Sequence, residues 1–133
     1  MIKEGETKII KKFKAHGFEC IICVIDGIWY TAYVRLPKEH PFYKKPYEYI
    51  NKFVDAHGGI NYSEEYVLDY KPQNSWFVGI DFAHALDVCK GKEITNPLPK
   101  SQNSTVWTLK KVEKEIRNLA KQLKVKNLVI SNL

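Results

Sequence analysis

Two acidic residues and one histidine follow each other at intervals of three positions, directly after the apolar run 76–80. These residues are Asp81, His84 and Asp87, and in a helical turn they would share one face. Together with His57 they would supply the imidazole and carboxylate groups that hold a divalent metal or perform acid–base chemistry. One hypothesis is therefore a metal-dependent hydrolase in which these four residues hold a cation that lowers the pKa of a bound water.

The same residues admit a structural interpretation. Asp81 would cap a short helix at the end of a strand, and His57 and His84 would be hydrogen-bonded packing groups beside a Gly58-Gly59 turn. No fixed ligand motif such as HExxH is present. The paired glycines also allow backbone N–H groups to cradle a phosphate or carboxylate. The sequence leaves these roles open.

Basic residues form a second group, in a chain with a net charge of +6 and a pI of about 9.1. Five of them recur at intervals of four and three positions near the C-terminus, which at about 100° per residue forms one stripe on a helix. The stripe could contact the phosphates of a nucleic acid or an acidic partner, or be a solvated face. Arg35, on a predicted strand, is a further candidate contact for an anion. The stripe consists of Lys110, Lys114, Arg117, Lys121 and Lys124.

Three cysteines occur in the chain, at positions 20, 23 and 89. Cys20 and Cys23 resemble half of a zinc knuckle, but residues three apart in a strand point to opposite faces. We expect core packing and free thiols, which are typical of a reducing compartment. The N-terminus is charged and no run reaches the roughly 20 apolar residues of a membrane span. These features predict a cytoplasmic protein without a membrane partner.

The strands and helices that carry these residues belong to one predicted domain, 1–133, which is long enough to bury a single core. Residues 6–13, 18–25 and 28–36 are β-branched or aromatic runs, separated by the turn at 15–17 and by Asp26-Gly27. An Asp-Gly pair between such runs is a strong hairpin signal, so an antiparallel meander is expected. Residues 37–46 contain three prolines and predict a surface loop.

The second half of the chain alternates helical and extended patterns. Apolar spacing predicts a short helix over 47–56, strands over 60–63 and 76–81, and a long connection over 88–105. A final amphipathic helix is expected to begin after an N-cap at Thr108. Residues 125–133 could add an edge strand or form a tail. The predicted fold class is α+β, with an antiparallel sheet packed against a short and a long C-terminal helix.

Three segments carry a resemblance to a known family: His57-Gly-Gly-Ile-Asn-Tyr-Ser63, the block 76–87, and the helix that opens at Trp107. Over about two thirds of its length the chain resembles small uncharacterised bacteriophage and prophage proteins, which carry HGG-[IL]-x-[YF] and W-x-x-G-x-D-x-x-H-A-x-D. Many of those relatives have cysteine in place of Phe82 and glycine in place of Leu86. The ligand-binding residues that the resemblance implies are His57, Gly58, Gly59, Asp81, His84 and Asp87.

The leading functional hypothesis is a phage-type accessory protein in the host cytoplasm. It would bind an anionic small molecule, such as a nucleotide-like signal, or a host defence protein, and so counter bacterial defence. Binding without turnover is favoured, and no catalytic residue is assigned. The alternatives are the metal-dependent hydrolase, with a divalent metal as its cofactor, and a nucleic-acid-binding module that uses the basic stripe. Apolar edge strands leave room for a homo-oligomer.

Overall fold

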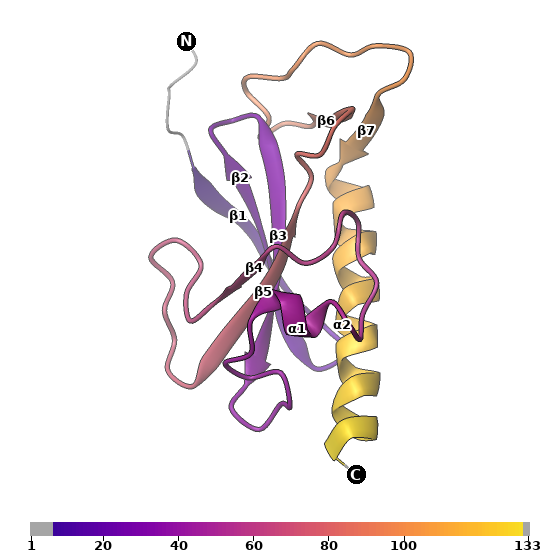
Figure 1. Cartoon of the computed structure of the whole chain (residues 1–133). Helices are drawn as coiled ribbons and strands as arrows, with labels where there is room; N and C mark the ends of the chain where they lie inside the picture. The colour runs from indigo at the N-terminus through magenta and orange to yellow at the C-terminus, as the bar shows by residue number, and fades with distance from the viewer. Residues whose placement is uncertain (1–6, 132–133) are drawn as a thin grey trace.

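The computed structural model describes residues 7–131 and has an α+β fold built on a five-stranded antiparallel sheet, as predicted (Figure 1). The strand order is β1-β2-β3-β5-β4. Glu6, where the first strand was expected to begin, lies outside the described residues. The strands are β1 Lys8–Ala15, β2 Phe18–Ile25, β3 Trp29–Pro37, β4 Tyr62–Glu64 and β5 Ser75–Asp81.

Tight turns join the first three strands into the expected meander. Asp26 and Gly27 have φ angles of 54° and 68°, and the Ile28 N–H donates to the Ile25 carbonyl at 2.9 Å. Positive φ at consecutive positions is the geometry that favours Asp-Gly in hairpins, because it matches the twist of the flanking strands. The Asp-Gly hairpin prediction is therefore confirmed.

The long helix α2, Leu109–Ser131, lies across one face of the sheet. Its predicted apolar stripe is buried, and Val112, Ile116 and Leu119 are fully covered. Thr108 caps the helix, since its hydroxyl accepts the Lys111 N–H at 3.3 Å. Both expectations for residues 125–133 are wrong over the described part, because α2 continues to Ser131. No glycine or proline interrupts 109–131, so nothing in the sequence ends the helix earlier.

The short helix α1 covers only Tyr47–Ile50, whereas a helix over 47–56 was predicted. Its hydrogen bonds change from the i−4 pattern at Asn51 to the i−3 pattern at Lys52 and Phe53. Beyond that point the chain makes turns. The apolar spacing indicated burial correctly, since Phe53 packs against the core, but it did not require a continuing helix.

The segment 88–105 was expected to be a long connection without regular structure. Two short strands lie at its two ends, and they pair with each other in parallel. Strands β6, Asp87–Lys90, and β7, Thr105–Thr108, pair with Cys89 opposite Trp107, near the start of α2 (Figure 1). The sequence did not reveal this pair, because each strand has only four residues and their partners are far apart in the chain.

The other face of the sheet carries a smaller apolar cluster. Val67 and Tyr70 cover Ile21, Cys23 and Phe77 there. Cys20, by contrast, belongs to the core beneath α2, so the two thiols lie on opposite faces and are free, as expected. Burial raises the pKa of both thiols to about 12. Among the described residues, neither helix has the length and apolar composition needed to cross a membrane.

Candidate functional site

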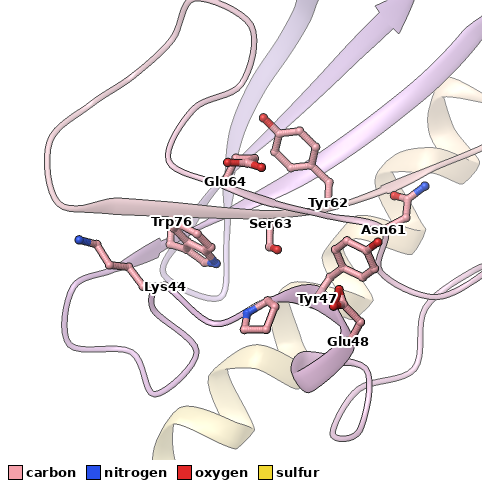
Figure 2. A pocket seen from close by; sticks show the side chains of 9 residues that line it. Lys44, Tyr47, Glu48, Asn61, Tyr62, Ser63, Glu64 and Trp76 are labelled. Atoms are coloured by element: carbon pink, nitrogen blue, oxygen red, sulfur yellow. The ribbon is translucent and has the colours of Figure 1, made fainter.

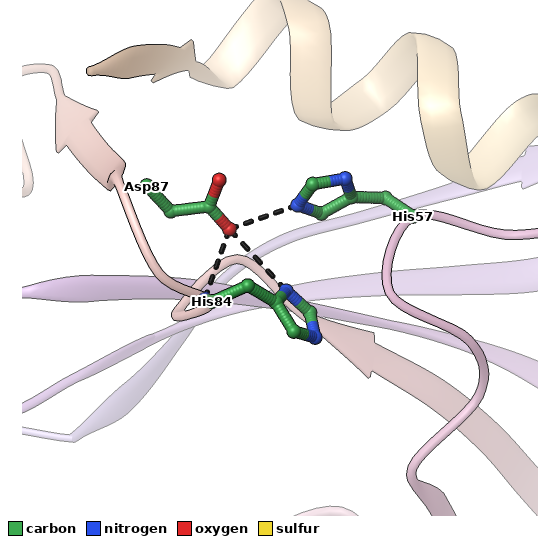
Figure 3. Close-up of side chains that lie close together, drawn as sticks. All are labelled: His57, His84 and Asp87. Carbon is green, nitrogen blue, oxygen red and sulfur yellow. Dashed lines mark hydrogen bonds and ion pairs between the residues drawn. The ribbon is translucent and has the colours of Figure 1, made fainter. Parts of the chain in front are cut away.

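The side chains of His57, His84 and Asp87 converge on one point (Figure 3). His57 Nε2 lies 2.8 Å from Asp87 Oδ2, and His84 Nδ1 lies 3.3 Å from the same oxygen. The ligand-type atoms of these three residues all lie within 4.8 Å of one another. The sequence hypothesis grouped four residues; three of them form this cluster, and Asp81 is not part of it.

Asp87 is the centre of the cluster and only 5 % of its surface is exposed. Its Oδ1 accepts the indole N–H of Trp107 at 3.0 Å, and its Oδ2 accepts the backbone N–H of His84 at 3.0 Å. Burial alone would raise the pKa of Asp87, but the hydrogen bonds from His57, Trp107 and the His84 backbone outweigh it, so the pKa is below its ordinary value. The group is therefore a carboxylate at neutral pH.

A tight loop, not a helical turn, brings the acids and the histidine together. Asp81 ends β5, Asp87 begins β6, and the Asp87 N–H donates to the His84 carbonyl at 2.8 Å. Leu86 enters the left-handed region with φ of 71° to close this turn. The prediction of a helical face, and the alternative of Asp81 as a helix cap, are both wrong.

Asp81 lies behind His84, on the side of the ring that faces away from Asp87. Its Oδ1 is 3.5 Å from His84 Nε2, and its Oδ2 accepts the Asn61 side-chain N–H at 2.6 Å. Asn61, Asp81, His84 and Asp87 thus follow one another in a chain of polar contacts. The order places one nitrogen of His84 toward each carboxylate.

Gly58 makes room for His84. A Cβ atom at this position would lie 2.0 Å from His84 Nε2, and Gly58 has φ of +69°. The Gly59 N–H donates to the Ala56 carbonyl at 2.9 Å, so it is already used within the turn. The two glycines therefore shape the site, and the expected cradle of free N–H groups loses one of its donors.

Side chains from other elements hold the loop that carries His57. Glu115 of α2 accepts the His57 backbone N–H at 2.8 Å. Gln122 accepts the Asp55 N–H and donates to the Asp55 carbonyl, both at 2.7 Å. Asn51 makes the same two-way contact with Ile60, again at 2.7 Å. Since irregular backbone is fixed at three points, the His57 imidazole is held in place before any ligand binds.

Aromatic rings form the wall of the site. Phe82 stacks on the His57 ring, with centroids 5.6 Å apart and planes 10° apart. Trp107 packs against both rings at 4.5 Å. His57 and His84 keep 26 % and 33 % of their side-chain surfaces exposed. A ligand can therefore reach the imidazoles from solvent, while Asp87 lies beneath them.

The basic candidates do not lie on one surface. Lys110, Lys114, Arg117, Lys121 and Lys124 are all exposed along α2, as the stripe predicted. Arg35 lies on the opposite face of the sheet, next to the cluster that contains Tyr33. Its guanidinium donates to the Ser75 hydroxyl at 2.7 Å and lies 3.6 Å from Glu19. Arg35 is thus paired with Glu19 and lies on a different surface from the basic stripe of α2.

A groove of about 380 Å³ runs beside β4 (Figure 2). Asn61 lines it toward one side and Lys44 and Trp76 toward the other. Because Asn61 also bonds Asp81, the groove begins next to the polar chain that includes His84. Glu48 and Glu64 line it too, so it combines aromatic rings with charges of both signs.

Three residues of the site were not among the sequence-based candidates. They are Trp107, at the opening of the expected C-terminal helix, Asn61, in the expected strand 60–63, and Glu115, within that helix. The sequence does mark Glu115 as unusual, because it is one of only two acids in a helix segment rich in lysine. Nothing in the sequence marks Trp107 as a site residue, since its contact with Asp87 depends on the parallel pairing of β6 and β7.

Comparison of the chain with protein-family models, with curated proteins and with solved structures finds no match.

Proposed function

We propose that the protein is a divalent-metal-dependent hydrolase whose metal ligands are His57, His84 and Asp87. The observation that carries the proposal is the convergence of two imidazole nitrogens and one carboxylate oxygen within 4.8 Å. Nitrogen and oxygen ligands of this kind suit zinc, manganese or iron. Three protein ligands leave a position for water, and a bound divalent ion lowers the pKa of that water toward neutrality.

The residues behind the ligands support a metal site. Histidine ligands usually donate their second ring N–H to a carboxylate or carbonyl, which fixes the ring and its tautomer. Asp81 occupies this place for His84, at 3.5 Å from Nε2, and Asn61 orients Asp81 in turn. Trp107 restrains the second oxygen of Asp87 in the same way. Each of these contacts favours a ligand geometry that exists before the metal arrives.

Thermal unfolding with added Zn²⁺, Mn²⁺ or Mg²⁺, together with metal analysis of the purified protein, tests the proposal. A metal at 100 times its dissociation constant stabilises the fold by about 2.7 kcal/mol, which is a shift of several degrees. The His84→Ala variant is expected to lose the shift. A matched control is His16→Asn, because His16 is exposed in the β1–β2 turn and asparagine tolerates its positive φ. No bound metal and no shift in the wild-type protein would contradict the proposal.

A second candidate function is the binding of an anionic ligand without turnover. In this function Asp87 would have a structural role, because its two oxygens accept hydrogen bonds from His57, the His84 backbone and Trp107. The exposed basic stripe on α2 would attract such a ligand. A phage-type accessory protein that captures a nucleotide-like signal is one form of this function. A thermal shift with nucleotides in the presence of EDTA, without product formation, would support it over the hydrolase.

A further inference from the structure

A hollow of about 480 Å³ lies on α2 next to the loop that carries His57. Two of its lining residues contact the candidate metal centre. The indole N–H of Trp107 donates to Asp87, and Glu115 accepts the backbone N–H of His57. The hollow and the metal centre are therefore neighbours that share side chains. The lining consists of Trp107, Lys111, Lys114, Glu115 and Asn118.

The charge of this hollow is positive. Lys111 and Lys114 are exposed, and within the described chain neither forms an ion pair. Glu113 pairs with Lys11 of β1, and Glu115 accepts the His57 N–H, so two lysines face one carboxylate in the lining of the hollow. The lysine charges therefore remain available to a ligand.

Position as well as charge favours an anion here. The Lys111 ammonium donates to the Val106 carbonyl at 3.2 Å, which keeps it beside β7 and Trp107. A second hollow shares Lys111 and Lys114 and continues to Lys110 and Arg117. The positive surface thus begins beside Trp107, which contacts Asp87 of the candidate metal centre, and extends along the helix. This arrangement fits an anionic ligand that lies next to the centre.

We propose that the substrate of the metal centre is a phosphoester whose phosphoryl group is held by Lys111 and Lys114. Lysine is a common point-charge ligand for phosphate, and Asn118 adds an amide donor. In the reaction, the oxygen of a water molecule forms a bond to phosphorus and the bond from phosphorus to the leaving oxygen breaks. The leaving alkoxide takes up a proton, so one water is consumed for each ester cleaved. This inference rests on the proposed hydrolase function.

The test is a titration of the metal-loaded protein with inorganic phosphate. The Lys111→Ala/Lys114→Ala variant is expected to bind phosphate about 10-fold more weakly or worse, because it loses two charge-assisted contacts. The Lys121→Ala/Lys124→Ala variant removes the same charge from the same helix and is the matched control. Equal losses in both variants, or no phosphate binding by the wild-type protein, would overturn the proposal.

Three further measurements separate this inference from the proposed function and identify the source of the phosphate. The Lys111→Ala/Lys114→Ala variant should keep the metal-dependent thermal shift, so a lost shift points to the fold and not to substrate binding. If the metal does not bind at all, the hydrolase proposal fails. Phosphate binding to the metal-free protein then still shows whether the hollow is a phosphate site. Adenosine monophosphate and a short oligonucleotide, tested side by side, distinguish a small phosphoester from a nucleic acid. Cleavage of either one with an increased KM in the variant supports the proposal.

Discussion

The imidazole of His84 occupies the space that a side chain at position 58 would need. A Cβ atom on Gly58 would lie 2.0 Å from Nε2 and 2.1 Å from Cε1 of His84. Real Cβ atoms do not approach other atoms so closely, so either the histidine or the loop must move. The HGG turn and the loop that follows β5 are thus fitted to each other at this contact.

If the proposed metal site exists, the Gly58→Ala variant is expected to bind its metal at least about 10-fold more weakly, because His84 must leave its place beside Asp87. It also loses about 1 kcal/mol of stability, since alanine is strained at positive φ. The control is Gly59→Ala, where φ is +81° but the nearest foreign atom would be 3.5 Å away. Metal titration and urea unfolding measure the two effects. Equal metal affinity in both variants would show that His84 is not a ligand.

Trp107→Phe keeps an aromatic ring against His57 but removes the N–H donor to Asp87. The pKa of Asp87 should rise, because this hydrogen bond is one of the contacts that lower it. Metal affinity is expected to fall by roughly 10-fold, as for other residues that orient a ligand. Trp76→Phe is the control, since the Trp76 N–H donates to the Lys45 carbonyl, away from the site. Calorimetric titration of both variants checks this, and parallel losses would point to a general packing effect.

His40 makes the stability of the fold depend on pH. It is 3 % exposed, its Nδ1 accepts the Phe42 N–H at 3.0 Å, and its Nε2 donates to the Leu123 carbonyl at 2.9 Å. Both nitrogens are used by the neutral ring, and burial lowers the pKa of His40 below 6.5 despite the bond to Leu123. Protonation is therefore resisted in the folded state.

Below pH 6.5 the unfolded chain takes up a proton at His40 before the folded chain does, so the free energy of unfolding falls as the pH falls. The slope contributed by one proton is at most about 1.4 kcal/mol per pH unit. Urea unfolding measured between pH 7.5 and 5 should show the free energy of unfolding falling in the wild type. In His40→Gln this free energy should depend less on pH. His16→Asn, which changes an exposed histidine, should keep the wild-type slope. Identical slopes in all three proteins would rule out His40 as the source.

Gln122→Ala removes both hydrogen bonds that tie Asp55 to α2. The loop 51–59 should open more often, because the free energy needed to open it falls by about 1–3 kcal/mol when the two hydrogen bonds are lost. Hydrogen exchange at the Asp55 and His57 amides measures the opening, and the exchange should be faster at both. Lys121→Ala, next to it on the helix and exposed, is the control. Unchanged exchange in Gln122→Ala would mean that Glu115 and Asn51 hold the loop without it.

The sequence predicted those parts of the fold whose signals are local. The Asp26-Gly27 turn, the meander and the capped amphipathic helix each depend on residues a few positions apart. The end of α2 was not predictable in the same way, because apolar β-branched residues near 125–130 suit a strand as well as a helix. The length of α1 was overestimated, since the apolar spacing that indicates burial does not distinguish a helix from successive turns.

The closeness of His57, His84 and Asp87 was predicted from the sequence, but the way in which the fold brings them together was not. The spacing of Asp81, His84 and Asp87 indicated mutual contact, and His84 does lie between the two carboxylates, but in a loop with Leu86 at positive φ. Trp107 is 20 residues from Asp87 along the chain and Glu115 is 58 residues from His57, so only the folded backbone reveals these contacts. Contacts between residues so far apart leave no periodic pattern in the sequence from which they could be predicted.

The parallel pairing of β6 with β7 has a consequence for how the protein is made. Trp107 and Glu115 leave the ribosome well after His57 and Asp87, and strand β7 must reach β6 before the indole N–H meets its carboxylate. Until then Asp87 lacks one of the donors that lower its pKa. The hydrogen-bonded arrangement around His57 and Asp87 is therefore complete only late in synthesis, after β7 and the start of α2 have been made.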